Sequence, residues 1–146
     1  MRLMYAMLLC SCAIAPKMEG NLRQCLEPTI VVAGAWIEPA YVEAFKRGVE
    51  WWGDAFVWGG RTNIETKDAG EGFVLVGFEE LGEGVCGITT IKSDGRGCIT
   101  KAVVKVAWEC SRDLKTVEEI VRHELGHTLG YDHAGYGVME PTIDAK

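Results

Sequence analysis

Residues 123–133 read His-Glu-Leu-Gly-His-Thr-Leu-Gly-Tyr-Asp-His, a spacing that predicts a metal site built on a helix. His123 and His127 stand four positions apart and therefore lie on the same face of an α-helix. From that face, two imidazole nitrogens can reach one zinc ion at about 2.0–2.1 Å. Gly130 can adopt the left-handed conformation that ends a helix, and the turn after it lets His133 swing back as a third ligand. The fourth coordination position then stays open for water or substrate, as in catalytic zinc sites.

Glu124 follows the first histidine, so it points into the same cleft without being forced onto the metal. A zinc ion lowers the pKa of its bound water to about 7, and a nearby carboxylate can accept the proton. Glu124 is therefore the predicted general base. The chain has 3 histidines, all inside this stretch, so its whole histidine content is explained by one zinc ion.

These residues match the signature H-E-x-x-H-x-x-G-x-x-H and resemble the metzincin metallopeptidases. Residues 137–141, Gly-Val-Met-Glu-Pro, look like the Met-turn of that family. The Met-x-Pro ending is closer to matrixins and reprolysins than to astacins and serralysins, which carry a tyrosine two residues after the methionine. The resemblance implies that Met139 forms an apolar floor beneath the zinc ligands.

Apolar runs rich in β-branched residues predict strands at residues 29–36, 55–60, 73–78, 87–92 and 102–108. Pro39 is expected to begin a helix with one apolar face, which Gly53 ends. A capping box of Thr116 and Glu119 is expected to begin the helix that carries the histidines. This order of elements resembles the upper subdomain of metzincins. It implies an α+β, zincin-like fold with a twisted mixed five-stranded sheet, a backing helix and an active-site helix.

Residues 93–97, Ser-Asp-Gly-Arg-Gly, predict a tight turn between the fourth and fifth strands. A turn explains Asp94 more simply than a calcium-binding loop does. By the resemblance, the fourth strand is the sheet edge above the cleft, where a peptide can add by backbone hydrogen bonds. Unless a loop covers that edge, we expect substrate to lie along Gly87, Ile88, Thr89, Thr90 and Ile91.

Residues 1–15 are typical of an export signal, with a basic residue before a short apolar run and small residues after it. Two processing routes stay open. Residues 13–15, Ala-Ile-Ala, have the form of a signal peptidase site, although Pro16 follows them. Residues 9–12, Leu-Cys-Ser-Cys, resemble a bacterial lipobox, in which Cys12 would carry the lipid. Either route predicts a secreted or extracytoplasmic protein. The second route would also anchor it to the cell surface through the lipid.

Residues 16–28 are expected to form a polar, extended N-terminal segment, and residues 29–146 one metzincin-like catalytic domain. With 48% hydrophobic residues, the chain has enough apolar material for a single core. The chain ends soon after Met139, so we expect a very short C-terminal subdomain. Either that subdomain is minimal or the chain is truncated.

Four cysteines would remain in the exported domain, which in an oxidising compartment predicts two disulfides with three possible connectivities. The expected pairs are Cys86–Cys98, across the hairpin between the fourth and fifth strands, and Cys25–Cys110.

The net charge of −6, without a basic stripe, argues against a nucleic-acid partner. No internal apolar span approaches the roughly 18 residues of a transmembrane helix, so membrane contact is expected only through a lipid on Cys12. The predicted function is a zinc-dependent endopeptidase with one catalytic Zn²⁺, acting as a monomer on peptides or proteins. The alternative is an exported zinc-binding structural or interaction module without catalysis, which would not require Glu124.

Overall fold

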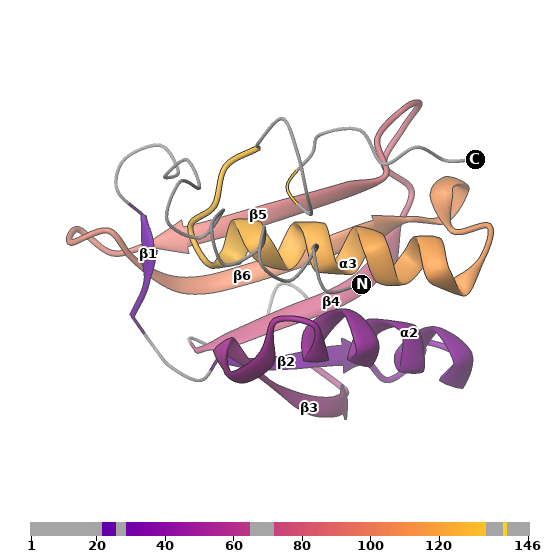
Figure 1. Cartoon of the computed structure of the whole chain (residues 1–146), viewed down its shortest axis with the longest axis horizontal. Coiled ribbons are helices and arrows are strands. Elements are labelled where there is room, and N and C mark those ends of the chain that lie inside the picture. The colour runs from indigo at the N-terminus through magenta and orange to yellow at the C-terminus, as the bar shows by residue number, and fades with distance from the viewer. Residues whose placement is uncertain (1–21, 26–28, 65–71, 134–138, 140–146) are drawn as a thin grey trace, which may run out of the picture.

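The computed structural model describes residues 22–25, 29–64, 72–133 and Met139. Within these residues two helices lie on one face of a mixed sheet (Figure 1), which confirms the expected α+β architecture. The strands are β1 (Arg23–Gln24), β2 (Thr29–Gly34), β3 (Phe56–Thr62), β4 (Phe73–Glu79), β5 (Gly87–Ser93) and β6 (Cys98–Ala107). The helices are α2 (Pro39–Glu50) and α3 (Leu114–Thr128). All five expected strands are present, and the two-residue β1 adds to them.

Several boundaries differ from the sequence expectations, most clearly the end of α2 and both ends of β6. Helix α2 begins at Pro39 as predicted, but it ends at Glu50, and Gly53 instead begins a short 3-10 turn. Strand β6 begins at Cys98 rather than at residue 102, and Trp108 starts a second 3-10 turn instead of ending the strand. Both 3-10 turns lie where the chain leaves one element for the next, which is where local periodicity carries least information.

The central strands of the sheet are parallel. β2 pairs in parallel with β3 on one side and with β4 on the other, and β4 pairs in parallel with β6. β5 runs antiparallel to β6 and, among the described residues, pairs with no other strand. β5 is therefore an edge strand of the described sheet, as the resemblance implied.

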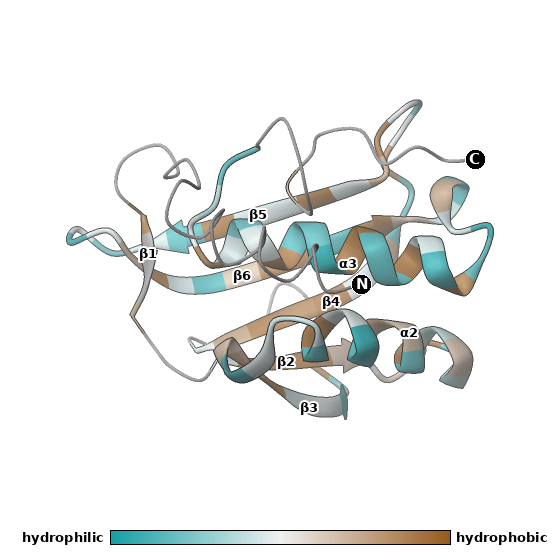
Figure 2. Ribbon diagram, in the orientation of Figure 1, coloured by the Kyte–Doolittle hydropathy of each residue, from teal (hydrophilic) through white to brown (hydrophobic). Residues whose placement is uncertain are grey.

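The core lies between this sheet and the two helices. Along β4, Val74, Val76 and Phe78 face the helices, whereas Leu75 packs on the opposite face of the sheet. The helices contribute apolar residues at a 3.6-residue period, all at most 8% exposed: Val42, Phe45 and Val49 from α2, and Val117, Val121 and Leu125 from α3. Trp52 and Leu129 continue these two stripes and are partly buried. Figure 2 shows this division, with apolar strands behind helices whose outer faces are polar. Packing therefore fixes α3 on the sheet.

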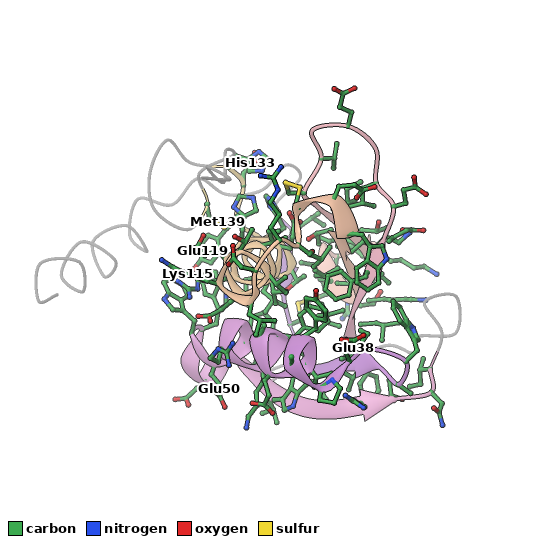
Figure 3. All side chains as sticks on the ribbon, turned by 90° about the vertical axis from the view of Figure 1, so that its right-hand side faces the viewer. Glu38, Glu50, Lys115, Glu119, His133 and Met139 are labelled. Carbon is green, nitrogen blue, oxygen red and sulfur yellow. A yellow bond between two sulfur atoms is a disulfide. The ribbon has the colours of Figure 1, made fainter. Side chains whose placement is uncertain are left out.

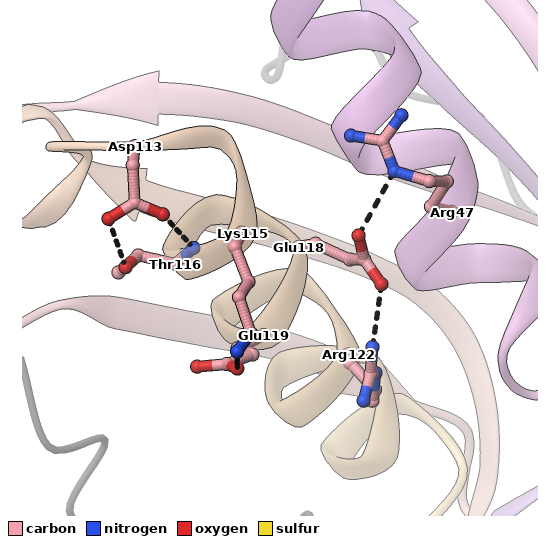
Figure 4. A network of polar contacts seen from close by, with 7 residues as sticks. All are labelled: Arg47, Asp113, Lys115, Thr116, Glu118, Glu119 and Arg122. Atoms are coloured by element: carbon pink, nitrogen blue, oxygen red, sulfur yellow. Dashed lines mark hydrogen bonds and ion pairs between the residues drawn. The ribbon is translucent and has the colours of Figure 1, made fainter.

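The two helices also pack closely against each other. A β-carbon added to Gly48 would stand 3.0 Å from Val121 Cγ1 and 3.1 Å from the Glu118 carbonyl oxygen, so α2 approaches α3 closely at this glycine. Beside it, Glu118 accepts hydrogen bonds from Arg47 Nε (3.0 Å) and from Arg122 Nη2 (2.7 Å), as Figure 4 shows. These side chains are partly exposed, so each ion pair contributes at most about 1 kcal/mol. The close packing at Gly48 is the stronger restraint.

The predicted capping box at Thr116 and Glu119 is wrong. Asp113 is the N-cap of α3, and its carboxylate accepts hydrogen bonds from the backbone N–H of Thr116 (2.8 Å) and from the Thr116 hydroxyl (3.0 Å). These bonds, the backbone one first, hold the pKa of Asp113 below its usual value. Glu119 forms an ion pair with Lys115 instead (Figure 4). Asp113 stands three residues before Thr116, and this is the spacing that an N-cap carboxylate needs.

The turn between β5 and β6 is built as predicted. The Asp94 carboxylate accepts hydrogen bonds from the backbone N–H groups of Arg96 (2.8 Å) and Cys98 (3.0 Å), and Gly97 has a φ of 80°. These bonds lower the pKa of Asp94. The carboxylate thus serves the turn.

Two disulfides are present, but neither expected pairing is correct. Cys25 is joined to Cys98, and Cys86 is joined to Cys110.

The strand register explains the difference. Cys86 lies at the open end of the β5–β6 hairpin, where the Ala107 N–H donates to its carbonyl oxygen (2.8 Å), whereas Cys98 lies at the turn end. Cys86 therefore meets Cys110, which follows the end of β6. Strand β1 pairs in parallel with the first residues of β6, so Cys25, which follows β1, reaches Cys98.

Removing either disulfide should destabilise the fold by releasing loop-closure entropy in the unfolded chain. The bridges span 73 and 24 residues. The chain-entropy model gives roughly 4 kcal/mol for the longer loop and between about 3 and 4 kcal/mol for the shorter one. Urea denaturation of Cys25→Ser/Cys98→Ser and Cys86→Ser/Cys110→Ser, beside the wild type, measures these losses.

Peptide mapping of the unreduced protein provides an independent check of the pairing. It should recover Cys25 linked to Cys98 and Cys86 linked to Cys110. A peptide joining Cys86 to Cys98 would contradict the register of β5 on β6.

Candidate metal centre

The histidines of α3 and of the turn after it converge on one point. Gly130 reverses the chain with a φ of 95°, as predicted, and His133 returns toward the helix. One ring nitrogen from each of His123, His127 and His133 lies within 4.8 Å of the other two, and His127 Nε2 is 3.2 Å from His133 Nε2. Two ligands of a tetrahedral zinc ion, each at about 2.0–2.1 Å, stand roughly 3.3 Å apart. The three histidines therefore fit a single metal ion.

Hydrogen bonding orients the middle histidine. His127 Nδ1 lies 2.8 Å from the backbone oxygen of Tyr131. Because a carbonyl oxygen can only accept, Nδ1 carries the proton and Nε2 keeps its lone pair for a metal. His123 is buried and His133 is exposed, so the site opens to solvent beside His133.

Trp52, just beyond α2, ties the turn to the helix. Its indole N–H donates to the carbonyl oxygen of Arg122 (2.9 Å), the residue before His123. Its ring stacks on Tyr131, with centroids 5.9 Å apart and an angle of 14° between the planes. Sequence analysis missed this role, because the helical period places Trp52 only on an apolar face and cannot show a contact 70 positions away.

Met139 is buried against α3. Figure 3 looks along this helix and labels Met139 and His133 on the side of it away from α2. A β-carbon on Gly126 would overlap the Met139 sulfur and stand 3.1 Å from Trp52 Cζ2. Gly126 thus leaves room for Met139 on the helical turn between His123 and His127.

The edge strand contacts Glu124. The Thr89 hydroxyl donates to Glu124 Oε2 at 2.6 Å and also lies 3.0 Å from the Glu124 backbone oxygen. A β-carbon on Gly87 would stand only 2.5 Å from Glu124 Oε1. Burial raises the pKa of Glu124, while the Thr89 hydrogen bond and the charge of His133 act in the opposite direction.

The five residues expected to bind substrate alternate along β5. Gly87, Thr89 and Ile91 are half-buried, while Ile88 and Thr90 are exposed. The structure therefore brings one face of the strand to Glu124 and leaves the other open. From the sequence, Thr89 was expected to bind substrate through its backbone. Its side-chain contact with Glu124 was not predicted.

A family model described as Metallo-peptidase family M12B Reprolysin-like matches residues 53–134, more than half of the chain. The chain belongs to this reprolysin-like family. The match runs from the end of α2 to just beyond His133, so it includes all three histidines and β5. It agrees with the metzincin resemblance of residues 123–133. A search of curated proteins finds no match.

The two disulfides indicate that this reprolysin-like chain works outside the reducing cytosol. None of the helices in the described ranges is long and apolar enough to span a membrane.

Substituting Trp52 should weaken metal binding without touching a histidine. Trp52→Leu removes both the stack on Tyr131 and the bond to Arg122, and we expect zinc affinity to fall about 10–100-fold, as for other groups that orient metal ligands. Trp52→Phe keeps an aromatic ring for stacking on Tyr131, so its zinc affinity should fall less than that of Trp52→Leu. Zinc competition with a chromophoric chelator measures both.

Trp36→Leu is the matched control, because Trp36 is 62% exposed and, in the described structure, its ring contacts Trp108 rather than Trp52 or Tyr131. It should keep its zinc affinity. Wild-type affinity in Trp52→Leu would show that the turn holds His133 without Trp52.

Proposed function

We propose that the protein is a zinc-dependent endopeptidase in which Glu124 is the general base. The observation that carries this proposal is the convergence of three histidine nitrogens, two from α3 and one from the turn after it, while α3 also carries the buried Glu124 carboxylate. A zinc ion held by His123, His127 and His133 would supply Lewis acidity, activating water and polarising the scissile carbonyl.

Glu124 moves the proton in this reaction. Its carboxylate accepts a proton from the attacking water and then gives it to the nitrogen of the departing amine. Its position supports this role, because it is adjacent to His123 in the chain and its carboxylate is buried beside the edge strand, where Thr89 binds it. Met139, buried against Gly126, is in a position that suits the floor expected beneath the ligands.

The peptide substrate is proposed to lie along the outer edge of β5, from Gly87 to Ile91. Support comes from the sheet, in which β5 pairs only with β6 among the described residues. An edge strand offers backbone N–H and C=O groups to which an extended peptide adds as a further strand. The exposure of Ile88, 41%, leaves a side chain available to contact such a peptide.

The protein is further proposed to be secreted or extracytoplasmic and monomeric. The two disulfides support an oxidising compartment. The expected export signal at residues 1–15 and the possible lipid on Cys12 lie outside the described residues. A lipid on Cys12 remains the proposed membrane contact, and nucleic acid is not a proposed partner.

Glu124→Gln should abolish most cleavage and leave metal binding intact. The amide keeps the size of the side chain but cannot accept the proton, so we expect kcat to fall about 10²–10⁴-fold. Cleavage of a mixed peptide library, followed by mass spectrometry, measures activity, and elemental analysis measures zinc.

Metal removal and the ligand variant His127→Ala complete this test. Dialysis against a chelator should stop cleavage, added zinc should restore it, and His127→Ala should lose both zinc and activity. If the wild type binds one zinc ion but cuts no peptide, the non-catalytic binding module is correct and the endopeptidase is not.

A further inference from the structure

We propose that Thr89 and Gly87 of β5 position the Glu124 carboxylate for proton transfer. Strand β5 is expected to bind substrate through its backbone. It would then also orient the general base, through the hydroxyl of Thr89 and through the space left by Gly87, which has no side chain. This inference rests on the proposed endopeptidase function and assigns positioning roles within the same site.

The hydroxyl of Thr89 restrains a torsion that is otherwise loose. The last side-chain torsion of glutamate has broad preferences, so the carboxylate plane turns freely unless something binds it. Thr89 has one hydroxyl hydrogen and two acceptors within reach, Glu124 Oε2 at 2.6 Å and the Glu124 backbone oxygen at 3.0 Å. The charged and nearer oxygen is the stronger acceptor. With Oε2 bound to Thr89, Oε1 becomes the oxygen presented to the attacking water.

Gly87 provides the space for this arrangement. A β-carbon at this position would stand 2.5 Å from Glu124 Oε1 and 2.8 Å from both Cδ and Cγ. The backbone of Gly87 lies in an extended strand, a conformation open to any residue, so the backbone does not require glycine here. Glycine is required here because the Glu124 carboxylate lies so close to this position.

The alternation of the strand places both residues on the same side. Gly87 and Thr89 are two positions apart, so both face Glu124. Their backbones are held from the other side by β6, with Gly87 paired to Val106 and Thr89 to Val104. Glu124 is in turn fixed by the burial of α3 in the core. The contact therefore joins two restrained elements, as an oriented catalytic group requires.

The test compares Thr89→Val, which removes the hydroxyl at nearly constant size, with Thr89→Ser, which keeps it. We expect kcat of Thr89→Val to fall about 10–100-fold, KM to change less than about threefold, and zinc content to stay at one ion. Thr89→Ser should retain kcat within about threefold. Thr100→Val is the matched control, because the Thr100 hydroxyl bonds the Lys92 carbonyl oxygen (3.2 Å) in the same hairpin, away from Glu124.

Gly87→Ala tests the space. It should lower kcat at least as much as Thr89→Val, since the new methyl group displaces the carboxylate. Gly77→Ala is its control, because among the described residues a β-carbon on Gly77 of β4 meets only Trp36 Cζ2, at an ordinary 3.9 Å. Melting temperatures of all variants report whether each one folds.

The outcomes separate the two proposals. If the wild type cuts peptides and Thr89→Val retains its kcat, or raises KM alone, Thr89 does not position the base and the inference is wrong. If Thr89→Ser loses as much kcat as Thr89→Val, the hydroxyl is not responsible. If the wild type itself cuts nothing while binding zinc, the endopeptidase proposal fails and takes this inference with it.

Discussion

A zinc ion bound by three imidazole nitrogens must lie about 2 Å from each of them, and much of the described structure holds the three histidines in position to allow this. Two of them need little help, because the helical repeat stacks His123 and His127 on one face. The third comes from a turn, which has no repeat to fix it. Gly130 supplies the reversal, and the Tyr131 carbonyl oxygen binds His127 while the Tyr131 ring rests on Trp52. The turn is thus tied both to the ligand before it and to the helix beside it.

Helix α3 packs in the core on one side and carries two histidines of the candidate metal centre on the other. Val117, Val121 and Leu125 are fully buried, so the helix cannot shift without disturbing the packing on the sheet. Helix α2 adds a second restraint through the close approach at Gly48, and the disulfide from Cys86 to Cys110 connects the start of β5 to the segment leading into α3. The packing of α3 and the disulfide therefore hold the candidate site in a fixed geometry.

The parts of the structure that the sequence predicted depend on short-range pattern. The histidine spacing, Gly130, the turn at Asp94 and the apolar stripes are each read within a few residues. Most of the failures are contacts between distant segments, and one, the N-cap of α3, is local. Disulfide pairing depends on strand register, which four cysteines alone do not specify, and both guesses were wrong. The N-cap of α3 was misplaced because Asp113 and Thr116 are both good caps, and only the observed geometry decides between them. Thr89 and Trp52 reach the site from 35 and 70 positions away, and no local signal marks such partners.

The alternation along β5 also bears on how such a protein can evolve. Positions 87 and 89 face Glu124, whereas positions 88 and 90 are exposed on the other face of the strand. Under the proposed function, mutations at the outward positions alter which peptides fit against the strand and leave the residues that contact Glu124 unchanged. In an endopeptidase of this design, alternate residues of one short strand would serve catalysis and peptide recognition separately, so that new preferences could be selected without a loss of catalytic competence.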